Sequence, residues 1–423
     1  MQATLTQAIQ LLQAGQLGPG RQVLRKLAKT APKDAVVQHW LGQAERALGN
    51  MDDAVSAHQR AVQLALNEPV LREHLAMALT YSNRGRNMLP AIECYAQLLR
   101  QYPQAEGAQN WAINAQTLAL RSAQPAVLRE VIAPYCASQP SARLEQLRLS
   151  GGLCIAAFLA GDFAEAATHA QQVLALRDQT HDAQGNPIVD DKYFYSIYAG
   201  FIRDLLAWHA ANPTMVAPAQ AQPVLHVIGE SHSLTAHGLR IAGQRVQAQL
   251  IMGAKAYFFG VPVGEAWQYS LEQCLRRVPA EAPVLVTFGE IDCRPNEGIM
   301  QQCINNPAYA LEQEIEKLVR GYVKFLHKAK GRRRGPVIVS GVPAPAEEKR
   351  AELTDDMAPR FARMIATFNQ CLAAACADYG FTFMDVYAHT NRGDGWAKRA
   401  MHLDGVHLNP SVLVHLLGGM VVR

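Results

Sequence analysis

Apolar residues in the first half of the chain recur at helical spacing, and small residues and turns repeat about every 34 residues. Gly49-Asn50 separates two amphipathic segments, and Ala54 and Ala61 are small at positions where two helices would approach each other. The matching positions are Gly15, Gly20, Leu24, Leu27 and Pro32, then Gly49, Ala54, His58, Ala61 and Leu66, then Ala91, Tyr95, Leu98 and Pro103. The pattern predicts antiparallel helix pairs in series, with a weaker unit at 161–166.

The last helix of this region is predicted over 192–211, after a polar loop at 181–191. It carries an aromatic stripe that consists of Tyr193, Phe194, Tyr195, Tyr198 and Phe201. Such a stripe could bind a ligand, but large aromatic side chains contribute most to packing when they are buried. We therefore expect the stripe to pack against the domain that follows.

The pattern changes after residues 213–223, which are rich in Pro, Ala and Gln and form a predicted linker. Apolar strand-like runs then alternate with amphipathic helices. The predicted strands are 224–228, 255–259, 284–288, 337–342 and 381–386, and the predicted helices are 264–277, 308–330 and 355–379. The alternation predicts a three-layer α/β/α domain with a mainly parallel sheet at 224–423, after an α-helical repeat domain at 1–212.

Polar clusters follow three of the predicted segments, at 229–233, 288–294 and 402–410. Ligand sites of parallel sheets lie beyond the carboxyl ends of the strands, so these clusters should converge. A serine needs a base to become a nucleophile, and His407 can serve Ser231 in this way, with Asp404 three residues earlier to orient the imidazole. The alternatives are that Ser231 caps a helix and that Asp404 and His407 form a structural pair.

Gly229-Glu230-Ser231 and Asp404-Gly405-Val406-His407-Leu408 together resemble the first and last blocks of the SGNH (GDSL-type) hydrolases. The resemblance covers about residues 222–423 and has Glu230 where the family commonly has Asp. It implies a three-layer α/β fold and a serine esterase with Ser231 as nucleophile, His407 as base and Asp404 as its partner. The acyl esters attacked by the family are those of carbohydrates, lipids and small molecules.

The middle blocks of the family match less closely. The resemblance implies a glycine amide in the oxyanion hole, and Gly260 at the end of the second predicted strand is our choice, with Gly253 as the rival. In Gly289-Glu290-Ile291-Asp292, Ile291 stands where the family has an oxyanion-binding Asn. Arg294 could replace that donor or hold an anionic group of the substrate. Alternatively, Glu290, Asp292 and Arg294 form an ion-pair cluster that braces the loop.

The helix pairs resemble tetratricopeptide repeats, with Leu41-Gly42 as the clearest hallmark pair. Repeat arrays present a concave surface, so a protein partner is expected to dock in this groove, although the array could also only complete the fold or dimerise it. The net charge of +4 is too small to indicate nucleic-acid binding. The sequence shows no long apolar run, no signal-peptide pattern and no metal-ligand spacing, so we expect no membrane span, no metal and no cofactor.

The eight cysteines form no CxxC pair, which is typical of reduced thiols in a cytoplasmic protein. The sequence thus predicts a cytoplasmic serine esterase that hydrolyses an O-acyl ester, with acetyl as one candidate group, on a carbohydrate or small molecule. Transfer of the same acyl group to another alcohol is one alternative. A non-catalytic binding or scaffold protein with a degenerate oxyanion hole is the other.

Overall fold

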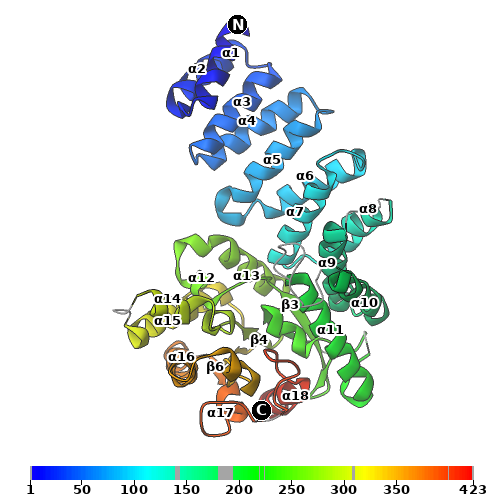
Figure 1. The fold of residues 1–423 in the computed structure, drawn as a ribbon, viewed down its shortest axis with the longest axis vertical. Helices are drawn as coiled ribbons and strands as arrows, with labels where there is room; N and C mark the ends of the chain where they lie inside the picture. The colour runs from blue at the N-terminus through cyan, green and yellow to red at the C-terminus, as the bar shows by residue number, and fades with distance from the viewer. Residues whose placement is uncertain are drawn as a thin grey trace. The chain divides into compact units, whose positions relative to one another are not determined.

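The computed structural model describes residues 2–138, 143–179, 194–218, 220–222, 224–306, 310–398 and 400–421. The chain forms two compact units. The first contains residues 1–119 and 127–149, and the second contains residues 120–126 and 150–423. Figure 1 labels their helices and strands.

The first unit is a series of helices in which each helix from α1 to α5 packs against the next. These are α1 (Gln2–Gln13), α2 (Leu17–Thr30), α3 (Ala35–Ala47), α4 (Met51–Leu64), α5 (Pro69–Tyr81), η1 (Asn83–Gly85), α6 (Met88–Gln101), α7 (Ala108–Arg121), the π-helical η2 (Leu128–Ile132), α8 (Ala133–Ser138) and the start of α9 (Arg143–Ala160). The repeat positions Ala54 and Ala61 are fully buried, and a Cβ on Gly42 would collide with the His58 ring. Small residues thus allow close helix approach, and the predicted helical repeat region is confirmed.

The second unit is built on a six-stranded sheet of order β2-β3-β1-β4-β5-β6. The strands are β1 (Val224–Gly229), β2 (Arg240–Ile241), β3 (Gln244–Leu250), β4 (Val284–Thr287), β5 (Val337–Ser340) and β6 (Thr382–Met384). Only the short β2 runs antiparallel to its neighbour, and the other pairings are parallel. Gly229 at the end of β1 pairs with Leu250 on one side and Thr287 on the other.

Helices cover both faces of this sheet. Successive strand residues point to opposite sides, and in β4 and β5 all of them are apolar or small and buried, so each face needs a covering layer. Val284 and Val286 face one core, and Leu285 between them faces the other. The first core packs against α12 (Ala256–Gly260), α13 (Glu265–Arg277), α14 (Gly298–Asn305), α15 (Leu311–Lys330) and α16 (Met357–Tyr379). The second core packs against α11 (Phe194–Ala211) and α18 (Pro410–Val421). The predicted three-layer α/β arrangement with a mostly parallel sheet is confirmed.

The predicted strand at 255–259 is wrong, because these residues begin helix α12. The Asp292 carboxylate accepts the amides of Ala256 and Tyr257 at 2.7 and 3.0 Å and thereby caps this helix. The second parallel strand is instead β3, in which buried Val246, Ala248 and Leu250 alternate with more exposed polar residues. This alternating strand lacks the continuous apolar run from which the other parallel strands were predicted.

The helices just before the predicted linker pack within the second unit. These are the later part of α9, α10 (Phe163–Gln179) and α11. Phe158 of α9 contacts His237 beyond β1, with 5.1 Å between the ring centroids. The change from helices to sheet therefore falls at 213–223, whereas the compact units divide near residue 150. None of the described helices combines the length and the apolarity needed to cross a membrane.

Candidate active site

Ser231 follows β1 directly and begins the 3-10 helix η4 (Ser231–Ala236). A side chain at Gly229 would collide with Thr287 of β4, so only glycine lets the two strands approach this closely. The serine thus lies at the carboxyl end of β1, which is an inner strand between β3 and β4. Parallel sheets place their ligand sites beyond the carboxyl ends of such strands. Ser231 is 5% exposed.

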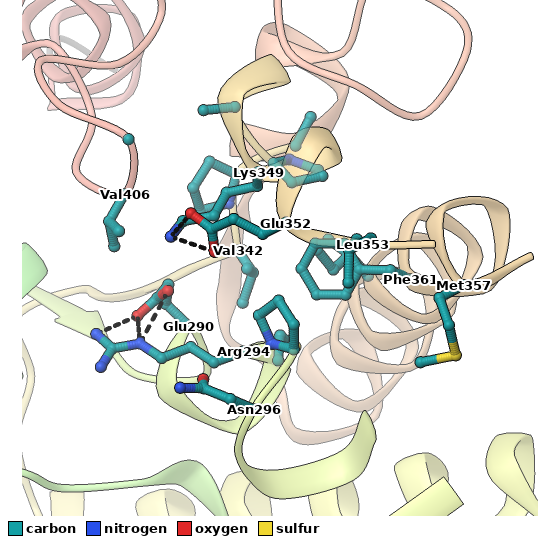
Figure 2. A pocket seen from close by; sticks show the side chains of 18 of the residues that line it. Glu290, Arg294, Asn296, Val342, Lys349, Glu352, Leu353, Met357, Phe361 and Val406 are labelled. Carbon is teal, nitrogen blue, oxygen red and sulfur yellow. Dashed lines mark hydrogen bonds and ion pairs between the residues drawn. The ribbon is translucent and has the colours of Figure 1, made fainter. Parts of the chain in front are cut away.

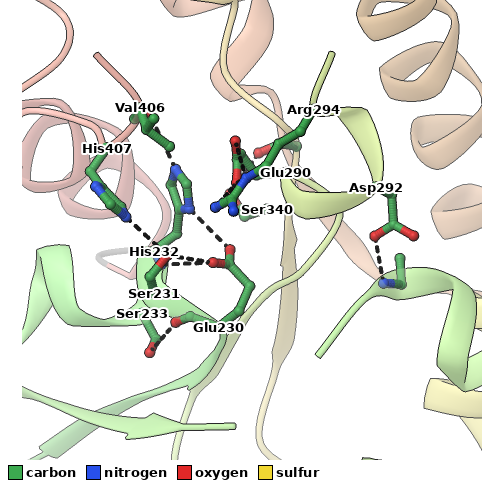
Figure 3. Close-up of polar contacts among 12 residues, drawn as sticks. Glu230, Ser231, His232, Ser233, Glu290, Asp292, Arg294, Ser340, Val406 and His407 are labelled. Atoms are coloured by element: carbon green, nitrogen blue, oxygen red, sulfur yellow. Dashed lines mark hydrogen bonds and ion pairs between the residues drawn. The ribbon is translucent and has the colours of Figure 1, made fainter. Parts of the chain in front are cut away.

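Ser231, His407 and Asp404 form a continuous hydrogen-bonded chain. The His407 Nε2 atom lies 2.9 Å from Ser231 Oγ, as Figure 3 shows, and His407 Nδ1 lies 2.8 Å from Asp404 Oδ2. Asp404 Oδ1 also accepts the amides of Val406 and His407 at 2.8 and 2.6 Å. Burial acts to raise the pKa of Asp404, but these hydrogen bonds and the nearby imidazole lower it overall. A carboxylate that stays ionised holds Nδ1–H toward itself and leaves Nε2 free to accept a proton.

Helix α11 lies against this chain. The Phe201 ring stacks on the His407 imidazole at a centroid distance of 3.7 Å and an interplanar angle of 12°. Tyr198, one helical turn earlier, is 6% exposed and interacts with the Ser231 side chain. The predicted packing of the aromatic stripe thus reaches the site itself. Tyr193 of that stripe and the predicted loop at 181–191 lie outside the described residues.

Glu230 and His232 flank Ser231 as a buried ion pair. The Glu230 carboxylate accepts the Ser231 hydroxyl at 2.8 Å and contacts His232 Nδ1 at 3.0 Å (Figure 3). His232 Nε2 lies 3.3 Å from the Val406 carbonyl oxygen. Burial opposes both charges, but the pair overcomes it: the pKa of Glu230 is lowered, and that of His232 is raised to about 9. The sequence pattern predicted no role for either residue.

Glu290 and Arg294 form a second ion pair beside the site. Arg294 Nε donates to the two Glu290 oxygens at 3.2 and 2.9 Å, and an Nη atom lies 2.8 Å from Oε2. Asp292 does not join this pair, because it points toward the start of α12, as Figure 3 shows. Its burial raises the pKa of Asp292 to about 6. The expected cluster of three is therefore a pair plus a helix cap, and Ile291 between them is buried.

Gly260 lies in α12 rather than at the end of a strand, and its Cα packs against Gly321 of α15. This close helix approach accounts for the glycine. Gly253 comes three residues after β3, with φ of +72°. Because Leu250 pairs with Gly229, Gly253 and Ser231 both lie just beyond the same edge of adjacent strands.

A cavity of about 450 Å³ opens beside the loop that carries Asp404 and His407 (Figure 2). Gly405 and Val406, which lie between these two residues in the sequence, form part of its wall. The remaining wall is mixed, with apolar and charged side chains that include Val342, Leu353, Met357, Phe361, Glu290, Arg294, Lys349 and Glu352. The Glu290–Arg294 and Lys349–Glu352 pairs leave the charged side of the cavity nearly neutral. It can therefore accept an uncharged group with both apolar and hydroxyl parts.

Glu230, His232 and Glu290 bring potential metal-ligand atoms within 4.8 Å of one another. However, Glu230 and Val406 engage the two nitrogens of His232, and Arg294 engages Glu290. Each carboxylate thus already has a cationic partner. The donor set fits two internal ion pairs better than a metal centre.

Comparison with known proteins gives one family-model match, in the second half of the chain. Residues 229–412 match the model of the GDSL-like Lipase/Acylhydrolase family. No curated protein matches the chain. Similar solved structures include a protein from Bacteroides fragilis NCTC 9343 assigned as an acylhydrolase (19% identity, 51% of this chain and 94% of that chain, TM-score 0.33). The lipase/acylhydrolase from Enterococcus faecalis is similar over 48% of this chain and 94% of its own (16% identity, TM-score 0.30).

An O-GlcNAc transferase mutant from Thermobaculum terrenum matches 81% of this chain and 45% of its own (13% identity, TM-score 0.23). At such identities and TM-scores, none of these structures bears on function. The family match stands independently of them and begins at Gly229, at the end of β1. Residues 229–412 therefore match the GDSL-like lipase/acylhydrolase family model, and a helical repeat region precedes them.

Proposed function

We propose that the chain is a serine esterase in which Ser231 is the nucleophile, His407 the general base and Asp404 the residue that orients His407. The observation that carries this proposal is the pair of contacts at the imidazole, 2.9 Å from Nε2 to Ser231 Oγ and 2.8 Å from Nδ1 to Asp404. This geometry suits removal of the serine proton by a fixed imidazole tautomer.

In the first step, Ser231 Oγ bonds to the ester carbonyl carbon while its proton passes to His407 Nε2. The tetrahedral intermediate collapses, the alcohol leaves with that proton, and an acyl-enzyme remains. Water then attacks the acyl group, again giving its proton to His407. The carboxylic acid leaves and Ser231 regains its proton, so that both atoms and charge balance.

The oxyanion of each intermediate needs hydrogen-bond donors. We propose the amides of Ser231 and Gly253, in place of the Gly260 amide expected from the sequence. Support comes from the pairing of Leu250 with Gly229, since it aligns the ends of β3 and β1. Gly260 is instead accounted for by its packing against Gly321.

The substrate that we propose is an O-acyl ester of a carbohydrate or another small molecule, and acetyl is one candidate acyl group. The volume of about 450 Å³ and the mixed wall of the cavity support a substrate of this size and polarity. Glu290 and Arg294 would contact its polar part from the cavity wall.

We also keep the proposal that the repeat region docks a protein partner. It is supported by exposed apolar side chains on these helices, such as Val70 at 51% and Tyr81 at 70% exposure. Affinity capture should recover a defined protein with the wild-type chain and lose it with Val70→Glu/Tyr81→Glu, while esterase activity is kept. Equal recovery by both chains would argue against docking at these residues.

Hydrolysis of short-chain nitrophenyl esters tests the esterase proposal. We expect wild type to show turnover and Ser231→Ala to lose at least about 10³-fold in kcat. Ser411→Ala, an exposed serine of α18, is the matched control and should behave as wild type. Absence of turnover in wild type would favour a non-catalytic binding protein instead. Ile291 is the residue that favours this alternative, because it is buried and stands where the family has an oxyanion-binding Asn.

A further inference from the structure

His407 and Glu230 lie within hydrogen-bond distance of the Ser231 hydroxyl, and Tyr198 also interacts with this side chain. Each can be assigned by its chemistry. His407 takes the serine proton in the proposed reaction. The carboxylate of Glu230, paired with His232, can only accept hydrogen bonds. The phenol of Tyr198 is therefore the one of these three that can donate to a developing negative charge.

The position of Tyr198 is fixed by the helix that carries it. Residues three apart lie on the same face of a helix, so Tyr198 and Phe201 of α11 point in nearly the same direction. Stacking of Phe201 on His407 at 3.7 Å sets the rotation of α11 about its axis. The same rotation directs Tyr198 toward Ser231. Tyr198 and Phe201 both lie outside the family-matched segment 229–412.

Tyr198 also remains protonated. Burial, and then the negative charge of Glu230, raise its pKa above that of an exposed phenol. The hydroxyl is thus a neutral donor over the whole range in which an esterase is assayed. Ile291, which occupies the loop after β4, has no side-chain donor to offer in its place.

We propose that the Tyr198 hydroxyl donates a hydrogen bond to the oxyanion formed on the substrate, and so joins the Ser231 and Gly253 amides as a third donor. This inference rests on the proposed esterase function. The carbonyl oxygen lies two bonds from Ser231 Oγ in the intermediate, and it therefore forms next to the side chain with which Tyr198 interacts. The carbonyl electron pair moves onto that oxygen, Tyr198 keeps its proton, and the serine proton goes to His407.

Tyr198→Phe removes only the donor and tests this assignment. Loss of one oxyanion donor typically costs about 10²–10³-fold in rate, so we expect kcat to fall by that factor with KM nearly unchanged. Tyr195→Phe, on the same helix, is the matched control and should keep wild-type kinetics. A trifluoromethyl ketone, which forms an oxyanion with the serine, should lose affinity for Tyr198→Phe by a similar factor.

Ile291→Asn adds a side-chain donor and completes the test. In the Tyr198→Phe background it should recover at least about tenfold in kcat, and in wild type it should change kcat less, because coupled sites are not additive. Wild-type turnover together with unchanged kcat and inhibitor affinity in Tyr198→Phe would overturn the role of Tyr198 alone. A wild-type chain without turnover would overturn this inference and the esterase together.

Discussion

The ring of Phe201 stacks on the imidazole of His407, with 3.7 Å between the ring centroids and 12° between the planes. Phe201 belongs to α11, before the start of the family-matched segment at Gly229. Two contacts therefore hold the imidazole of the proposed base: Asp404 binds Nδ1 at the ring edge, and Phe201 packs on the ring face. Helix α11, which precedes the family-matched segment but belongs to the same compact unit, is thus part of the candidate site.

Phe201→Leu should lower kcat by up to about tenfold, because an aromatic contact contributes about 0.5–1.5 kcal/mol beyond its buried area. The smaller side chain would let the imidazole leave its position relative to Ser231. Steady-state kinetics on a nitrophenyl ester measures the effect. Phe194→Leu, at the exposed start of the same helix, serves as control, and equal kinetics of the two variants would contradict the positioning role.

Asp404→Asn should lower kcat by about 10³–10⁴-fold, because an amide can donate to Nδ1 and then favours the wrong tautomer of His407. KM should change little, since Asp404 contacts the imidazole and backbone amides rather than the substrate. The exposed Asp355→Asn is the matched control. If Asp404→Asn kept wild-type kcat, Asp404 and His407 would be only a structural pair.

The structure separates what a local pattern can predict from what it cannot. The contact among Ser231, His407 and Asp404 was predictable, because these residues lie in two short blocks of characteristic residues. Strand β3 was not, because its alternating polar residues lack the continuous apolar pattern of β1 and β4. The strand predicted at 255–259 was wrong for a related reason, since its apolar run belongs to helix α12, in which Gly260 lies.

The roles of α11 could be predicted only in part. The aromatic stripe indicated packing against the next domain, but which ring meets which partner depends on the rotation of the helix against the sheet unit. Nothing in the local sequence around Tyr198 or Phe201 encodes that relationship. The ion pair of Glu230 and His232 was likewise hidden, since its two members flank Ser231 in sequence without any recognisable spacing.

Arg294→Gln should raise KM several-fold with little change in kcat, because Arg294 lies in the cavity wall and its guanidinium is engaged by Glu290. Measurement of kcat and KM separately distinguishes the two roles expected from the sequence. Arg320→Gln, an exposed arginine on α15, is the control. A large fall in kcat at constant KM would instead make Arg294 an oxyanion donor.

The Glu230–His232 pair should make stability depend on pH. The folded state raises the pKa of His232 from 6.5 to about 9, so its favourable contribution is complete below 6.5 and is lost as pH rises toward 9. The lowered pKa of Glu230 adds a loss below 4.5. Thermal unfolding followed between pH 6 and about 9 should show a decline in wild type that is flatter in His232→Gln. The exposed His415→Gln should keep the wild-type decline, and equal slopes in all three proteins would contradict the pairing.

The central claim is that Ser231 forms a covalent bond to the acyl carbon. Its most direct test is incubation of the full chain with a fluorophosphonate, followed by digestion and mass mapping of the adduct. We predict one modified site, Ser231, in wild type, and no adduct in Ser231→Ala or after prior incubation with an ester that acylates the enzyme. An adduct at another residue, or an unmodified Ser231 in the folded protein, would contradict the account.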